Sequence, residues 1–183
     1  MDLFFTLLLT VFRTYSGPRD ANVWDGTRYR FKPKFWDRTS RGQLFPSRIP
    51  SFIDISLINF FIGTRMSAVV RRNGWIPIVI SSVQTRQQPD IPGGALEIHT
   101  RVVGWEDQYV EIEHTWFDAV GAEVLTSVYL TRVTHAGRNT ITGADMLIEL
   151  GEPYAEKPLS GAARALLEEY LRVKDANQAL SLA

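Results

Sequence analysis

The sequence predicts an α+β fold in which an antiparallel sheet wraps around one long central helix. The first observation is the segment Ser51–Arg72, where apolar residues surround the helix axis on nearly all sides, so this helix must be buried on nearly all sides. The second is a change of apolar period from helical to alternating in the segments that follow it. These predicted strands are Ile76–Arg86, Leu96–Val103, Tyr109–Phe117 and Glu123–Val133.

The ends of the central helix carry local signals of their own. Pro50 suits a first helical turn, and Ser51 followed by Asp54 imitates a capping box. Asn73-Gly74 predicts the end of the helix, and the two arginines just before it complement the negative end of the helix dipole. We therefore expect one uninterrupted helix over this segment.

Further elements flank this core. The aromatic segment Tyr29–Trp36 predicts an earlier strand, and Ser160–Ala179 has the apolar spacing of a helix. The connections between the later strands are short, so neighbouring strands are expected to pair antiparallel. These connections are 88–94, 104–108 and 118–122.

Composition indicates one ordinary globular domain. The 183 residues fit a single domain with a sizeable core, which we divide into an N-terminal helix and linker (1–28), a core (29–134) and a C-terminal extension with a helix (135–183). Lys+Arg and Asp+Glu are both 20, which argues against nucleic acid as a partner. The chain has no cysteine and only three histidines, so we expect no metal, no cofactor and a cytoplasmic protein.

The N-terminal segment Leu3–Phe12 is almost entirely apolar. Spanning a bilayer takes about 20 such residues, and a signal peptide would have a positive start and a cleavage site that this segment lacks. We expect a short helix packed on the body or on a partner subunit. Contact with a membrane surface through residues 3–12 is the alternative.

A buried helix wrapped by an antiparallel sheet is the hotdog architecture. One such sheet covers only part of so apolar a helix, so we expect a second subunit to cover the rest in a homodimer with a two-fold axis.

Two stretches of the chain resemble the thioesterase superfamily of hotdog proteins, in particular its THEM-type members. The first is Arg71–Val79, similar to the helix end and following strand of that family. The second is Val103–Trp116, containing Glu113-His114, similar to its central hairpin. The apolar N-terminus also has a counterpart there, and the likeness covers about residues 28–134. The resemblance implies a hotdog fold and activity on an acyl thioester without a cofactor.

The chain departs from the family at the start of the central helix. Members usually carry an Asp after the first strand, which Asp37 could match, and then a His-x-Asn-Asn-Gly-x-Tyr-like element. Here the helix opens Ile49-Pro50-Ser51-Phe52-Ile53-Asp54-Ile55, without the His and the Asn pair, and the preceding loop is expanded. This leaves two alternatives to hydrolysis of an acyl or polyketide-type substrate. One is a hotdog that catalyses isomerisation, dehydration or cyclisation, and the other is a non-catalytic acyl-binding protein.

Three residues are candidates for catalysis. Thioester hydrolysis needs a carboxylate that attacks or activates water, and Asp37 and Asp54 both lie near the start of the central helix. Asp54 could equally be a capping residue, and Asp37 a turn residue. His114 shares an inward strand face with Trp116, so it could act as an acid or base or be a core histidine.

Substrate contacts are predicted on the central helix and beside it. Ser56, Asn59 and Gly63, followed by Ser67, form a stripe that could line an acyl channel or simply pack against another backbone. Trp116 would contribute to the same cavity. Arg48, with Arg38 and Arg41 in the same loop, could meet the phosphates of coenzyme A or of a carrier-protein arm.

Overall fold

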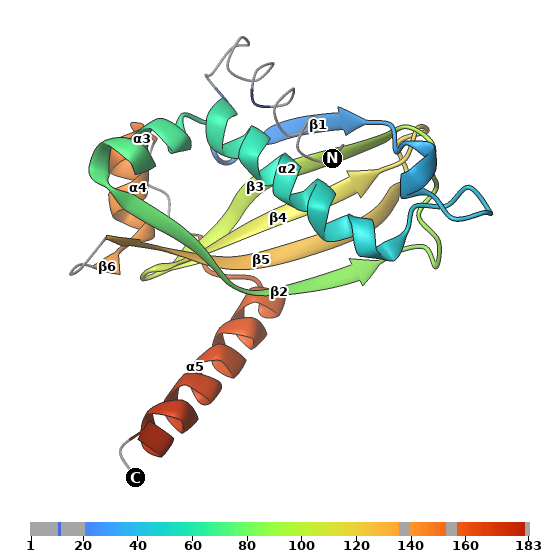
Figure 1. The fold of residues 1–183 in the computed structure, drawn as a ribbon. Coiled ribbons are helices and arrows are strands. Elements are labelled where there is room, and N and C mark those ends of the chain that lie inside the picture. The colour runs from blue at the N-terminus through green and yellow to red at the C-terminus, as the bar shows by residue number, and fades with distance from the viewer. Residues whose placement is uncertain (1–10, 12–20, 136–139, 153–156, 182–183) are drawn as a thin grey trace.

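The computed structural model describes residues 11, 21–135, 140–152 and 157–181, and its centre is one antiparallel sheet (Figure 1). The strand order is β1-β3-β4-β5-β2, and the short strand β6 pairs with β5. The strands are β1 (Thr27–Phe31), β2 (Trp75–Arg86), β3 (Leu96–Glu106), β4 (Tyr109–Phe117), β5 (Glu123–His135) and β6 (Thr140–Ile141).

Helices lie on both faces of this sheet. Helix α2 (Ile49–Gly63) runs across one face and continues into α3 (Met66–Asn73), while α5 (Gly161–Ser181) begins on the other face and extends away from it (Figure 1). Helix α4 (Gly143–Leu150) stands at the end of the sheet beside α3. Two 3₁₀ turns, η1 (Phe35–Asp37) and η2 (Pro46–Arg48), lie in the loop before α2. The predicted α+β arrangement of a sheet wrapped around a central helix is confirmed.

The topology corrects one expected connection. Strands β3, β4 and β5 follow one another as antiparallel neighbours, as predicted. Strand β2, however, pairs with β5 and not with β3, from Trp75 opposite His135 to Arg86 opposite Leu125. The segment after β2 therefore carries the chain across to the other side of the sheet and is not a hairpin turn. As a result β2 is an edge strand, in contact with α3 and α5.

The central helix is broken, which the apolar pattern did not predict. Arg65 adopts a left-handed conformation with φ of 61°, and the chain bends by 79° between α2 and α3. The expected Ser51–Asp54 capping box is also wrong, because α2 begins at Ile49 and places both residues inside the helix. The predicted end is confirmed, since Gly74 caps α3 with a left-handed φ of 62°.

Several smaller expectations change as well. Strand β1 ends at Phe31, before Pro33, which has no N–H for a sheet, and the chain then forms η1 where a strand was expected. Helix α4 was not predicted, whereas α5 confirms the expected C-terminal helix. The predicted N-terminal helix lies outside the described residues apart from Val11. Among the described residues no single helix is long and apolar enough to cross a membrane; the bent pair Pro46–Gly63 and Met66–Asn73 reaches that criterion only together.

Two apolar cores hold the layers together. The larger core lies between α2 and the sheet, around Phe52, Phe60 and Trp116. The smaller one lies on the opposite face, where Leu167 of α5 packs with Tyr109 and Leu130. The outer face of β4 also carries a buried carboxylate, Glu111, which accepts hydrogen bonds from the residue that precedes α5. This bond anchors the start of α5 to the sheet.

Candidate functional site

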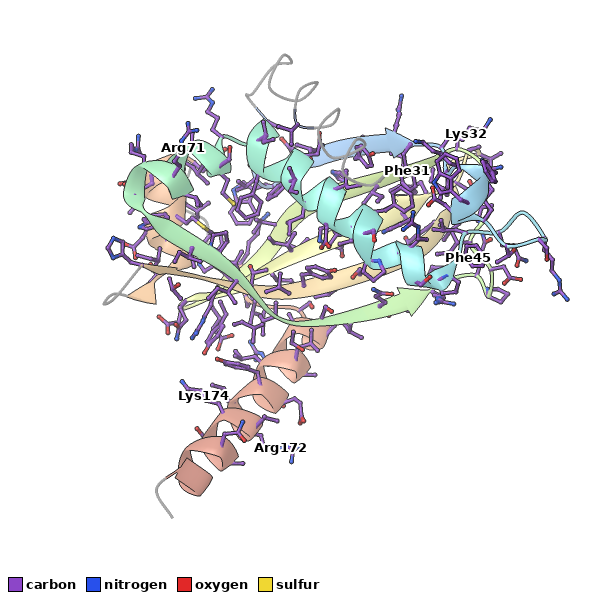
Figure 2. All side chains as sticks on the ribbon, viewed as in Figure 1. Phe31, Lys32, Phe45, Arg71, Arg172 and Lys174 are labelled. Atoms are coloured by element: carbon purple, nitrogen blue, oxygen red, sulfur yellow. The ribbon has the colours of Figure 1, made fainter. Side chains whose placement is uncertain are left out.

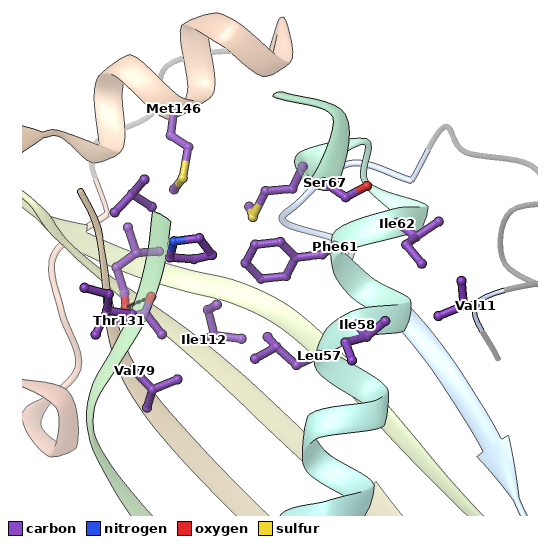
Figure 3. A pocket seen from close by; sticks show the side chains of 15 residues that line it. Val11, Leu57, Ile58, Phe61, Ile62, Ser67, Val79, Ile112, Thr131 and Met146 are labelled. Atoms are coloured by element: carbon purple, nitrogen blue, oxygen red, sulfur yellow. Dashed lines mark hydrogen bonds between the residues drawn. The ribbon is translucent and has the colours of Figure 1, made fainter. Parts of the chain in front are cut away.

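An apolar cavity of about 440 Å³ lies between the central helix and the sheet (Figure 3). Leu57 and Phe61 point from α2 toward Ile112 on β4 and Thr131 on β5. Among the described residues of the lining, Ser67 and Thr131 are the only ones with polar side chains. These lining residues are Val11, Leu57, Ile58, Phe61, Ile62, Met66, Ser67, Pro77, Ile78, Val79, Val110, Ile112, Thr131, Val133 and Met146. Such a cavity suits a hydrocarbon chain or an apolar ring.

The break between α2 and α3 helps to form this cavity. A straight helix would carry residues 66–70 onward along the axis of α2. The bend at Arg65 instead turns α3 so that Met66 and Ser67 join the lining. The cavity is therefore bounded by both helices and by the start of β2.

Asp54 lies one helical turn before the cavity. It precedes Leu57 and Ile58 by three and four residues, so the three side chains share a face of α2. Asp54 is accessible, yet the atoms packed around its carboxyl group partly desolvate it and raise its pKa above the ordinary value. A carboxylate of raised pKa beside an apolar cavity is a suitable general base.

Tyr129 lies on the sheet, near enough to Asp54 for the carboxylate charge to influence its pKa. Its side chain is buried on β5, and its pKa is raised by burial first and by the negative charge of Asp54 second. Tyr129 lies opposite Ile112 of the cavity lining in the β4–β5 register. Because a phenol with a raised pKa stays protonated, the hydroxyl can donate a hydrogen bond to an oxygen held near Asp54. Sequence reasoning did not single out this residue. The available signal was its position on the predicted inward face of the alternating segment that forms β5.

His114 belongs to a buried polar chain beneath the helix. Its Nδ1 lies 2.9 Å from Oγ1 of Thr100, which lies 2.5 Å from Oγ of Ser56 on α2. All three residues are fully buried, and the His114 ring meets the ring of Tyr129 edge to face at 4.9 Å. Burial lowers the pKa of His114 to about 3, so the ring is uncharged at neutral pH. His114 does not line the cavity itself, and its role as acid or base stays a prediction.

Asp37 and Arg48 form an ion pair. Nε and one terminal nitrogen of Arg48 lie 2.7 and 2.6 Å from the same oxygen of Asp37. The other oxygen accepts a hydrogen bond of 3.1 Å from the backbone N–H of Lys34. Asp37 is almost completely buried, so both of its oxygens hold the loop before α2. This arrangement supports the interpretation of Asp37 as a turn residue, and Arg48 is turned toward it.

The remaining predicted contacts face away from the cavity. The side-chain N–H of Asn59 donates to Oγ1 of Thr27 over 3.1 Å, and a Cβ at Gly63 would meet Cγ2 of Thr27 at 2.8 Å. Together with Ser56, these residues let α2 approach β1 and β3 closely. This agrees with the interpretation that the stripe of small and polar residues on α2 serves close packing against another backbone. Trp116 is fully buried and packs edge to face on Phe52. Their role as substrate contacts stays a prediction.

Several solved structures share this fold. The 4-hydroxybenzoyl-CoA thioesterase from Pseudomonas sp. strain CBS-3 is 18% identical, with a TM-score of 0.54 over 69% of this chain and 99% of its own. A 1,4-dihydroxy-2-naphthoyl-CoA thioesterase from Synechocystis is 7% identical, with a TM-score of 0.54 over 69% of this chain and 98% of its own. A thioesterase-superfamily protein from Jannaschia sp. is 10% identical, with a TM-score of 0.59 over 76% of this chain and 99% of its own.

These similarities define the class of fold. The chain has the hotdog fold in the form that thioesterase-superfamily proteins share, as the sequence resemblance implied. No protein-family model matches the chain, and no curated protein sequence matches it significantly. At these identities the similarity establishes the fold, while the chemistry has to be argued from the site itself.

Proposed function

We propose that this protein is a thioesterase that binds the apolar acyl part of its substrate in the cavity and cleaves the thioester beside Asp54. The observation that carries the proposal is the position of Asp54, which extends the cavity-lining face of α2 by one turn. An acyl chain lying along that face would bring its carbonyl carbon next to the carboxylate. The acyl-CoA thioesterases that share the fold support this choice of reaction.

Each residue near the thioester would have a defined part in the reaction. The carboxylate of Asp54 would take a proton from a water molecule that attacks the carbonyl carbon, or would attack that carbon itself. The hydroxyl of Tyr129 would donate to the oxygen that becomes negatively charged. The thiol would leave with the proton that Asp54 takes from the water. If Asp54 attacks directly, a water molecule would then hydrolyse the acyl anhydride formed with Asp54 and supply the proton of the thiol. No step of this scheme uses a cofactor, and the thiol could belong to coenzyme A or to a carrier-protein arm.

An alternative is a protein that holds an acyl or polyketide-type molecule without hydrolysing it, or that rearranges it. One observation favours this alternative: among the described residues that line the cavity, none has an ionisable side chain. If Asp54 does not act on the thioester, the cavity can bind and shape an apolar molecule but supplies no acid or base. The sequence departure at the helix opening, which lacks the family's polar element, is in keeping with this alternative.

The deciding experiment compares Asp54→Asn with Asp37→Asn. Hydrolysis of a panel of aliphatic and aromatic acyl-CoA thioesters is measured for the wild type and both variants. We expect Asp54→Asn to lower kcat by about 10²–10⁴-fold with little change in melting temperature. Asp37→Asn should mainly lower the melting temperature, because it weakens the ion pair with Arg48. Full activity in Asp54→Asn would refute the proposal.

A second measurement addresses the alternative. Native mass spectrometry of the purified protein should reveal any small molecule retained in the cavity. No turnover of any thioester by the wild type, together with a retained apolar molecule, would favour the binding or rearranging alternative.

A further inference from the structure

We propose that one end of the molecule docks on an anionic lipid surface. This end, which we call the loop end, consists of residues 32–45 and the turn around Val120. The inference does not depend on the proposed function. It rests on exposed apolar side chains and on charge.

The loop end carries four of the large apolar side chains that are exposed in the described structure. Phe35 is 79% exposed and Val120 is 88% exposed. Trp36 and Phe45 are each 40% exposed. Single exposed apolar residues are common on protein surfaces, but several grouped together mark an interaction site.

These side chains come from three segments that lie next to each other. The backbone N–H of Phe45 donates to the carbonyl of Asp37 over 2.9 Å, which joins the two parts of the loop. The rings of Phe35 and Trp36 contact each other at 4.6 Å. Lys32 and residues 118, 119 and 121, beside Val120, border one surface hollow of about 690 Å³. Figure 2 places Lys32 and Phe45 at this same end, far from Arg71 and Lys174.

The same end is basic, although the whole chain has a net charge of zero. The segment 28–48 contains a single acidic residue, Asp37, and the basic residues Arg28, Arg30, Lys32, Lys34, Arg38, Arg41 and Arg48. Asp37 is neutralised by Arg48, and Glu97 by Arg28 and Arg30. Asp90 and Asp118 are the other acidic residues on the adjoining loops 87–95 and 118–122. The loop end therefore keeps an excess of positive charge.

This combination of side chains fits a bilayer surface. Phenylalanine and tryptophan rings insert at the boundary between headgroups and acyl chains, and each nearby Lys or Arg adds electrostatic attraction to anionic lipid. Lys34 illustrates the pairing, with its Nζ 4.9 Å from the centre of the Trp36 ring. A nucleotide, as the rival ligand, would need only one aromatic side chain on which its base could stack. Four apolar side chains from three segments, all at one end, suit an extended surface better.

The test is binding to vesicles at low and high salt. Wild-type full-length protein should sediment with vesicles of phosphatidylcholine mixed with phosphatidylserine, and less with phosphatidylcholine alone or with added salt. The double variants Phe35→Ser/Trp36→Ser and Lys32→Glu/Arg41→Glu should each lower the partition coefficient by about tenfold or more. Matched controls at other places are Ile148→Ser, at a residue that is 70% exposed, and Lys174→Glu; both should bind as the wild type does.

Two results would overturn the inference. The first is absence of vesicle binding by the wild type. The second is undiminished binding by both double variants, which would assign membrane contact to another part of the chain. Binding of free coenzyme A is measured in parallel. If the variants lose affinity for coenzyme A while the wild type ignores vesicles, the loop end is a nucleotide site and not a lipid surface. Thermal melting of each variant verifies that it is folded.

Discussion

Nδ1 of His114 lies 2.9 Å from Oγ1 of Thr100, and none of the described residues offers a hydrogen-bond partner to Nε2 of the same ring. Burial away from water disfavours the charged form of this imidazole and lowers its pKa to about 3, so the ring is neutral at neutral pH. The ring therefore affects stability in a way that depends on pH.

The first prediction concerns this pH dependence. The unfolded chain binds a proton on His114 near pH 6.5 and the folded chain only near pH 3, so between these values the unfolded state carries more protons. Stability contributed by the neutral ring is complete above pH 6.5 and falls as the pH drops, by at most about 1.4 kcal/mol per unit. In His114→Gln, the contribution of His114 to the slope of unfolding free energy against pH should vanish. Urea unfolding of both proteins from pH 7 to 4 measures it, and equal slopes would contradict the prediction.

The same variant separates a structural role from a catalytic one at neutral pH. If His114 is a core residue, His114→Gln should cost about 1–3 kcal/mol and leave the activity per folded molecule intact. If it is an acid or base, the rate should fall by about 10²–10⁴-fold with little loss of stability. Its burial away from the cavity lining leads us to expect the first outcome.

The second prediction is the pH profile of hydrolysis. Because the pKa of Asp54 is raised, kcat/KM should decline as the pH falls through a value above the usual 3.8 of an aspartate. Protonation removes the base, so the low-pH limb should have unit slope. Tyr129→Phe should slow the reaction by about 10²-fold by removing a donor, and should not remove that limb. A flat profile in the wild type across the acidic range would exclude Asp54 as the base.

The third prediction tests the cavity. Leu57→Trp places a bulky indole ring in the cavity of about 440 Å³. It should reduce kcat/KM for long or aromatic acyl groups more than for acetyl. Leu171→Trp, at an exposed position on α5, is the matched control. It should leave kcat/KM unchanged for both long and short acyl groups. Equal losses for short and long acyl groups in Leu57→Trp would mean that the acyl chain binds elsewhere.

The fourth prediction concerns Glu111. Its oxygens accept hydrogen bonds from the backbone N–H and the hydroxyl of Ser160, over 2.8 and 2.6 Å, at the start of α5. Glu111→Ala should lower the free energy of unfolding by about 1–3 kcal/mol and should speed hydrogen exchange in α5. Glu168→Ala, at an exposed position on the same helix, should have a negligible effect. Unchanged exchange in α5 of Glu111→Ala would refute this anchoring role.

The fifth prediction is a homodimer through β2. No strand of the described residues pairs with the outer side of this edge strand, and Ile76, Ile78, Val79 and Val83 are exposed along it. An apolar edge strand readily pairs with another chain. Sedimentation at micromolar concentration should give about twice the 20.8 kDa mass of one chain, and Val83→Lys should shift the protein toward the monomer. A monomeric wild type would leave the edge strand unpaired and refute the prediction.

The sequence by itself determined the class of fold and most of its elements, although not helix α4 or the break between α2 and α3. A segment that is apolar on nearly all sides predicts a buried helix, and alternating segments predict strands with one buried face; Phe60 and Ile112, from one segment of each kind, are buried in the core. The glycine after α3 and the amphipathic C-terminal helix were equally local signals. Asp54 was identified as a candidate because it lies near the predicted start of the central helix. In the structure it lies inside α2 and does not cap it.

Only the tertiary structure decided which residues meet. Strand β2 pairs with β5 across the sheet, a choice that short connections do not determine because every strand offers the same backbone hydrogen bonds. The break at Arg65 has no local signal in the sequence, since Arg has no intrinsic preference for a left-handed φ. Pairing of Asp37 with Arg48, and the approach of Asp54 to Tyr129, join residues that are distant along the chain. Their roles follow from that proximity, because charge and burial act through space and leave no local pattern in the sequence.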